Sequence, residues 1–142
     1  MIYNIYIFNK SGVCIYYEEW NRKKPSSNLA EEQKLLFGML YSLKSFLSKS
    51  SPRPMDPSTA FHCFKTTTYK LHFYETLSSV KFIILTDPNT PDLRDELKKV
   101  YSTVFIDYVI KNPLYEPNSI IKCELFITHL NQMIKQIPYY NI

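Results

Sequence analysis

The chain has 142 residues, a net charge of +4 and 45% hydrophobic residues. We therefore expect residues 1–142 to form a single domain with its own core. Only two glycines, Gly12 and Gly38, accompany nine prolines and twelve tyrosines. A glycine-rich phosphate loop, a dinucleotide-binding fingerprint and a Gly-x-Ser-x-Gly nucleophile elbow all need closely spaced glycines, so the sequence excludes these three kinds of site.

Positive charge is concentrated in the first half of the chain. Residues 1–71 contain twice as many lysines and arginines as acidic residues. This bias favours an acidic protein or an anionic membrane surface as a partner, and it is too weak to indicate nucleic acid. Surface lysines that merely face solvent are the simpler explanation.

The three cysteines lie far apart, in apolar stretches and without a metal-binding spacing. We expect Cys14, Cys63 and Cys123 to be small buried residues in a reducing compartment. No apolar run reaches the ~18 residues of a membrane span, and the N-terminal residues do not resemble a signal peptide. We therefore expect a cytoplasmic protein whose membrane contact is peripheral.

Short β-rich runs predict five strands. Residues 2–8 are apolar at both alternating sets of positions, as in a central strand that is covered on both faces. Residues 13–17 form a second run, and Gly12 in the turn between them can adopt a positive φ. Three further strands, joined as a meander, are predicted at residues 59–66, 69–76 and 80–87. Within the last of these, residues 82–85 are again apolar on both faces, as in a central strand.

Apolar residues at helical spacing predict a first helix over residues 29–50. Asn28 and Glu31 form a capping-box pattern at its start. These apolar positions cover a wide part of the helix surface, so we expect this helix to be covered on more than one side. Gly38 in its middle costs ~1 kcal/mol relative to alanine. We attribute that glycine to the close approach of another backbone, the sheet in preference to a partner subunit.

Two more helices are predicted in the last third of the chain. One begins with Thr90 as its cap and Pro91 at its first position, and it stops at Asn112 before a proline. The other spans residues near 119–137. The order of two strands, one helix, three strands and two helices indicates an α/β (α+β) fold with helices on both faces of one sheet.

No pattern of residues points to catalysis or metal binding. His62 and Cys63 are neighbours on a predicted strand, so their side chains point to opposite faces. His129 has no carboxylate or histidine one helical turn away, and His72 is separated from Glu75 by an odd offset on a strand. We therefore predict no catalytic, cofactor-binding or metal-binding residues. The many tyrosines either pack the sheet or bind a protein partner, and we favour the second role.

Several long stretches resemble one known family. IYIFNKSGVCIYYEEWNRKK, KLLFGMLYSLKSF, YKLHFYET, KFIILTD and RDELKKVYS occur in order over nearly the whole chain. They resemble the subunit 1 family of the transport protein particle (TRAPP) complex, the smallest of its sedlin-like subunits. The resemblance implies a longin-like (SNARE-like) fold, with a mostly antiparallel sheet in the order 2-1-5-4-3, one helix on one face and two on the other. A turn at residues 77–79 replaces the glycine-containing turn that is usual in this family.

The resemblance also implies a function. It implies a non-catalytic scaffold subunit of a vesicle tether that acts between the endoplasmic reticulum and the Golgi and exchanges guanine nucleotide on a Rab-type GTPase. It implies subunits 3 and 4 as neighbours, and peripheral association with cis-Golgi and endoplasmic reticulum membranes. One alternative is a stand-alone longin-type regulator of a SNARE or small GTPase. Another is a small hydrolase or transferase, which requires a pocket with converging polar groups.

We expect the helix at residues 29–50 and the loop at residues 20–24 to contact protein partners. Five basic residues of this region predict a positive surface that faces an anionic membrane or an acidic partner: Arg22, Lys23, Lys24, Lys44 and Lys49. Their neutralisation is expected to weaken liposome binding of the assembled complex in a salt-dependent way. The predicted interface residues are Trp20, Arg22, Lys23, Lys24, Phe37, Met39, Tyr41 and Lys44.

Overall fold

A five-stranded antiparallel sheet forms the centre of the computed structural model, which describes residues 1–22, 27–50 and 63–141. The strands follow the order β2-β1-β5-β4-β3, which confirms the order that the resemblance implies. The central strands β1 and β5 are apolar on both faces and are largely buried, as predicted. The strand bounds are Ile2–Phe8 (β1), Cys14–Glu19 (β2), Cys63–Lys65 (β3), Lys70–Glu75 (β4) and Lys81–Thr86 (β5).

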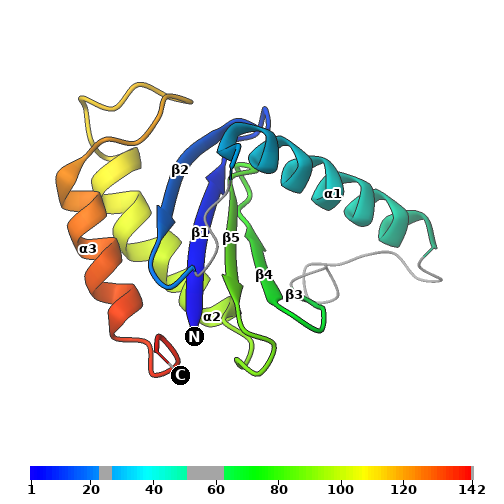
Figure 1. Cartoon of the computed structure of the whole chain (residues 1–142). Coiled ribbons are helices and arrows are strands. Elements are labelled where there is room, and N and C mark those ends of the chain that lie inside the picture. Colours follow the sequence, from blue (N-terminus) through cyan, green and yellow to red (C-terminus); the bar gives the residue numbers. More distant parts are fainter. Residues whose placement is uncertain (23–26, 51–62, 142) are drawn as a thin grey trace.

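Helices cover both faces of the sheet (Figure 1). α1 (Leu29–Ser50) lies on one face, and its C-terminal end extends past the strands. α2 (Arg94–Lys99), the π-helix η1 (Val100–Ile110) and α3 (Glu124–Lys135) lie on the other face. Because η1 directly continues α2, this face carries two helical rods, as the resemblance implies.

The helix η1 matches the spacing of its buried side chains. A π-helix hydrogen-bonds from residue i to i+5 and is therefore wider than an α-helix. The buried positions of η1, namely Val100, Val104, Phe105 and Val109, accordingly recur every four to five residues. This spacing keeps one apolar side of η1 against the sheet and α3.

Two turns that connect neighbouring strands of the sheet contain a residue in the left-handed backbone conformation. Gly12 has a φ of +87° in the turn between β1 and β2, which confirms its predicted role. Ser79 has a φ of 67° in the turn between β4 and β5. Thus the turn that lacks the family's usual glycine keeps a left-handed position and fills it with serine.

The predicted starts of the last two helices are wrong. Thr90 does not cap α2, because its hydroxyl donates to the carboxylate of Asp87 within a turn. Helix α2 begins four residues later, where the backbone N–H of Arg94 donates to the Asp92 carboxylate at 3.1 Å. The start of α3 is delayed from residue 119 to Glu124, because the backbone N–H of Ile121 instead donates to the carbonyl of Ile15 on β2.

Three further expectations need correction. Within the described residues the third strand is limited to Cys63–Lys65, and residues 59–62 lie outside them. Cys14, Cys63 and Cys123 are half-buried free thiols, not fully buried residues. No described atom outside the local helix backbone lies within 4 Å of the position that a Cβ on Gly38 would take. The sheet therefore does not explain this glycine.

Candidate protein interface

Helix α1 buries little of its surface within this chain. Among its described side chains only Leu40 is fully buried. On another side, Leu35, Met39 and Phe46 follow one another at helical spacing, and we call them the apolar stripe. Leu35 is 67% exposed and Phe46 is 65% exposed. The expectation that α1 is covered on more than one side is therefore wrong for the chain alone, and exposed apolar side chains in a row are typical of a binding surface.

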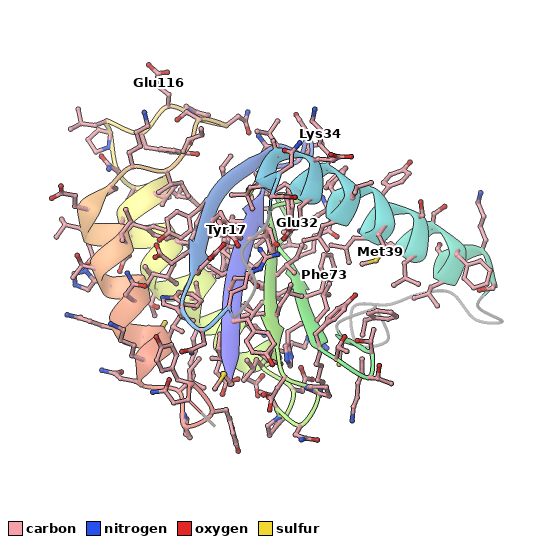
Figure 2. All side chains as sticks on the ribbon, in the orientation of Figure 1. Tyr17, Glu32, Lys34, Met39, Phe73 and Glu116 are labelled. Carbon is pink, nitrogen blue, oxygen red and sulfur yellow. The ribbon has the colours of Figure 1, made fainter. Side chains whose placement is uncertain are left out.

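Polar contacts hold the N-terminal end of α1 against the sheet. The side-chain oxygen of Asn28 accepts a hydrogen bond from the backbone N–H of Glu31 at 3.2 Å, which confirms the predicted cap. The Glu32 carboxylate accepts hydrogen bonds from the Tyr6 hydroxyl and, at 2.9 Å, from the Arg22 guanidinium. Figure 2 shows Glu32 on the side of α1 that faces Tyr17 and the sheet. The hydrogen bond to the Glu32 carboxylate raises the pKa of Arg22.

Aromatic packing holds the middle of α1. The ring of Phe37 lies 5.8 Å from the ring of Phe8, between centroids. A Cβ on Gly12 would lie 2.7 Å from the Phe37 ring, so Gly12 is needed for this contact as well as for its positive φ. The ammonium group of Lys81 lies 5.4 Å from the centroid of the same ring, at the distance of a cation–π interaction.

The structure separates the predicted interface residues into groups. Trp20 lies toward the opposite face, where its indole N–H donates to the side-chain oxygen of Asn131 on α3 at 2.6 Å. Arg22 and Phe37 make the intramolecular contacts just described. Lys23 and Lys24 lie outside the described residues. Three of the predicted interface residues are solvent-exposed on α1, namely Met39, Tyr41 and Lys44.

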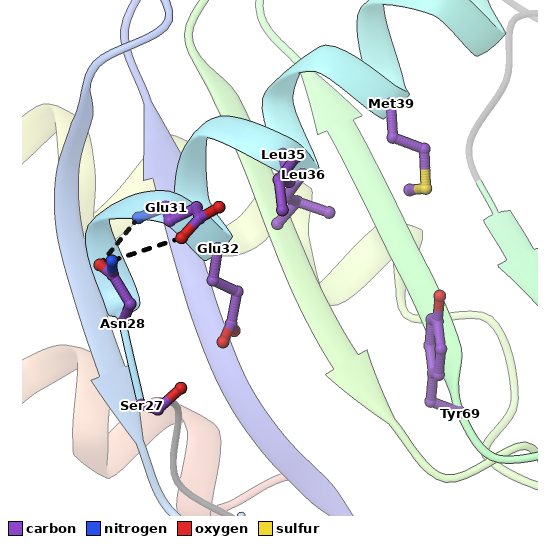
Figure 3. A pocket seen from close by; sticks show the side chains of 8 residues that line it. All are labelled: Ser27, Asn28, Glu31, Glu32, Leu35, Leu36, Met39 and Tyr69. Carbon is purple, nitrogen blue, oxygen red and sulfur yellow. Dashed lines mark hydrogen bonds between the residues drawn. The ribbon is translucent and has the colours of Figure 1, made fainter.

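An acidic hollow of about 380 Å³ lies beside the N-terminal half of α1 (Figure 3). Glu31 and Glu32 line one end of it, and Tyr69, the residue before β4, contributes its ring. Leu35 and Met39 of the apolar stripe form part of its wall. This hollow therefore offers apolar surface beside negative charge.

A larger hollow of about 590 Å³ lies on the other flank of α1, and we call it the basic hollow. The ammonium groups of Lys44 and Lys81 both lie within ion-pair distance of the Glu75 carboxylate. Burial lowers the pKa of Lys81. The lining residues are Lys10, Ser11, Phe37, Leu40, Tyr41, Lys44, Ser45, Ser48, Phe73, Glu75, Ser79 and Lys81.

Sequence reasoning missed three charged residues of the basic hollow, Lys10, Glu75 and Lys81. A signal for two of them exists in the strand alternation. Leu71 and Phe73 on β4 point toward α1, and the next position of that face is Glu75. On β5 the same face continues to Lys81, which pairs across the strands with Glu75. The alternation of the two strands predicts apolar residues at both positions, and each position holds a charged residue instead. This departure from the pattern could have indicated the basic hollow from the sequence.

The described part of the chain contains neither a metal-binding cluster nor a membrane-spanning helix. It contains no group of three or more histidine, cysteine, aspartate or glutamate side chains that could hold a metal ion. None of the helices within the described ranges is long and apolar enough to cross a membrane.

Comparison with known proteins identifies the family. The model of the Sybindin-like family matches residues 2–137. The trafficking protein particle complex subunit 1 of Dictyostelium discoideum is 64% identical over 99% of both chains. The human protein of that name is 39% identical over 99% of this chain and 96% of its own. Subunit 4 of the same complex from Dictyostelium discoideum is 35% identical over 94% of this chain and 96% of its own.

A solved structure, the gliding protein MglB of Thermus thermophilus, aligns with 63% of this chain and 64% of its own at a TM-score of 0.46 and 11% identity, a likeness too distant for any inference. The family match and the relatives at 64% and 39% identity span essentially the whole sequence. The chain therefore belongs to the Sybindin-like family.

Proposed function

We propose that this chain is a single-domain, non-catalytic scaffold subunit of a TRAPP complex. The observation that carries the proposal is the 64% identity to a subunit 1 over 99% of both chains. The exposed apolar stripe of α1 supports it, because a protein that works inside an assembly exposes apolar surface when it is isolated. The charged groups of the basic hollow offer positive charge and hydrogen-bond donors, which suit binding better than catalysis.

The proposal extends to the role of the assembly. The complex would tether vesicles between the endoplasmic reticulum and the Golgi, and as a whole it would exchange guanine nucleotide on a Rab-type GTPase. Subunits 3 and 4 are the proposed neighbours of this chain. The chain itself would be cytoplasmic and would associate with cis-Golgi and endoplasmic reticulum membranes only peripherally, an arrangement that its net charge of +4 supports.

Co-expression with subunits 3 and 4 of the same organism, followed by size-exclusion chromatography, tests this proposal. We expect the three chains to elute together. Met39→Glu should disrupt the assembly, because it places a charge in the apolar stripe. Leu114→Glu is the matched control, since Leu114 is also exposed but lies outside α1. A wild-type chain that elutes as a stable monomer beside its partners would instead support the stand-alone regulator.

Liposome binding tests the proposed membrane contact. The structure directs this test to the exposed Lys49, because Arg22 anchors α1 and Lys44 forms an ion pair with Glu75. Changing Lys49 to glutamine should weaken binding of the assembled complex to anionic liposomes, most strongly at low salt where charges are least screened. Unchanged binding at low salt would contradict a membrane-facing role for this surface.

A further inference from the structure

The basic hollow contains charges in positions where a sheet normally buries apolar side chains. Glu75 and Lys81 lie at the ends of β4 and β5, on the face that α1 covers. Their side chains are only 20% and 13% exposed. Half-buried charges beneath a helix cost desolvation energy, so their retention calls for an explanation beyond packing.

Positive charge exceeds negative charge in this hollow. Glu75 is shared by Lys44 of α1 and Lys81 of β5. Lys10, in the turn after β1, forms no ion pair with any described residue. Three lysines and one glutamate therefore line the hollow, and a carboxylate from outside would reduce its excess of positive charge.

The hollow also has an apolar part. Phe37 and the buried side chains of Leu40 and Phe73 line it, together with four serines and Tyr41. A simple anion such as inorganic phosphate would leave this apolar part in contact with water. An occupant that fits both parts carries a carboxylate beside an aromatic or aliphatic group.

The position of the hollow favours a polypeptide as that occupant. Tyr41 lines the hollow and is 70% exposed, so the hollow opens onto the free surface of α1. Tyrosine beside an apolar pocket is typical of the centre of a protein interface. Among the described residues, the lining includes no arginine, the side chain whose planar fork best matches a phosphate.

We propose that the basic hollow receives an acidic segment of a neighbouring subunit. A carboxylate of that segment lies among Lys10, Lys44 and Lys81, and an adjacent apolar side chain packs on Phe37 and Phe73. This proposal rests on the proposed function.

A peptide titration tests the hollow separately from the assembly. The probe is N-acetyl-Glu-Phe-Glu-amide, and its neutral counterpart is N-acetyl-Gln-Phe-Gln-amide. We expect the acidic peptide to shift the backbone amide signals of Ser11, Ser45 and Ser79 in NMR spectra of the full chain, with about tenfold tighter binding than the neutral peptide. Equal binding of both peptides, or shifts elsewhere only, would overturn the proposal.

Paired variants then connect the hollow with assembly. Lys10→Glu/Lys44→Glu should abolish peptide binding and weaken co-elution with the partner subunits, whereas Lys98→Glu/Lys122→Glu on the other side of the molecule should change neither. Because Lys44→Glu would repel Glu75, Lys10→Gln/Lys44→Gln provides a milder variant, and thermal melting checks that each one folds.

The outcomes separate the two proposals. If the wild-type chain does not assemble, the proposed function fails while the peptide titration still judges the hollow. If the wild type and the Lys10/Lys44 variants assemble equally well, the hollow lies outside the interface and the proposal is overturned. Binding to phosphatidylserine vesicles that needs Lys10 and Lys44, without peptide binding, would overturn it in favour of a membrane site.

Discussion

The two faces of the sheet are covered to very different degrees. On one face, α3 buries Phe126, Leu130 and Ile134 within its twelve residues. On the other face, α1 has 22 residues and fully buries only Leu40 among its described side chains. The α3 face is thus completed within the chain, whereas the α1 face retains a surface that another protein can cover.

The two faces also differ in the contacts that attach their helices to the sheet. Phe82 on β5, Phe105 on η1 and Phe126 on α3 form a chain of edge-to-face aromatic contacts, with the first two ring centroids 5.2 Å apart. The backbone N–H of Ile2 also donates to the carbonyl of Tyr140, which ties the C-terminal segment to β1. α1 is instead attached by the ion pairs of Glu32 and Lys44 and, at its middle, by Phe37 and Leu40. We infer that the α3 face carries most of the stability and the α1 face most of the recognition.

Truncation of one phenylalanine on each face gives the largest predicted contrast. Phe126→Ala should lower the free energy of unfolding by about 3–5 kcal/mol, because it leaves a cavity in the core. Phe46→Ala on α1 should change it by less than about 0.5 kcal/mol, because that ring is exposed. Urea denaturation followed by circular dichroism measures both values. A large loss for Phe46→Ala would show that the chain itself completes its α1 face.

Buried His72 makes the α3 face sensitive to acid. The ring is fully buried, accepts a hydrogen bond from the backbone N–H of Leu93 and lies 2.9 Å from the Thr86 hydroxyl. Burial, together with the charge of Lys70, lowers the pKa of His72 to about 4 from 6.5. Protonation therefore favours the unfolded chain, and stability should fall by about 3 kcal/mol as the pH decreases from 6.5 to 4.

Urea denaturation at several pH values measures this effect. His72→Gln should be less stable than the wild type at neutral pH, because glutamine cannot reproduce both hydrogen bonds of the ring. It should also lose the part of the pH dependence that lies between pH 6.5 and 4. An unchanged pH profile in His72→Gln would show that other groups cause the acid sensitivity.

The sequence predicted the sheet better than the surfaces. Two-sided apolar runs identified β1 and β5 as central, because burial on both faces leaves a direct pattern in the residues. The start of α2 could not be predicted from Thr90, because its hydroxyl donates to the carboxylate of Asp87, three residues earlier, in a turn that precedes the helix. The place of Trp20 against Asn131 depends on a contact 111 residues away. The basic hollow likewise brings together residues from turns, strands and α1 that no local motif connects.

Gly38→Ala separates stability from recognition on the α1 face. Alanine should stabilise the isolated chain by about 0.5–1 kcal/mol, because it favours the helix and its methyl group meets open space. If a partner backbone approaches α1 at this point, the same methyl group should weaken co-elution with the partner subunits. Thermal melting and size-exclusion chromatography give the two readings. A stabilised variant with unchanged assembly would place the partner away from Gly38 and leave that glycine unexplained.

The smallest predicted effect concerns Ser79, at the rim of the basic hollow. A serine at a φ of 67° is strained relative to glycine, so Ser79→Gly should stabilise the turn, with a net gain of about 0.5 kcal/mol once the greater freedom of glycine in the unfolded chain is subtracted. The carbonyl of residue 79, which accepts a hydrogen bond from Lys81 at 3.2 Å, remains in the variant. Peptide binding to the hollow should therefore be unchanged, while the melting temperature of the chain rises slightly. Weaker peptide binding would show that the Ser79 hydroxyl itself contacts the occupant, and recognition on the α1 face would then extend from the helix into the turn between β4 and β5.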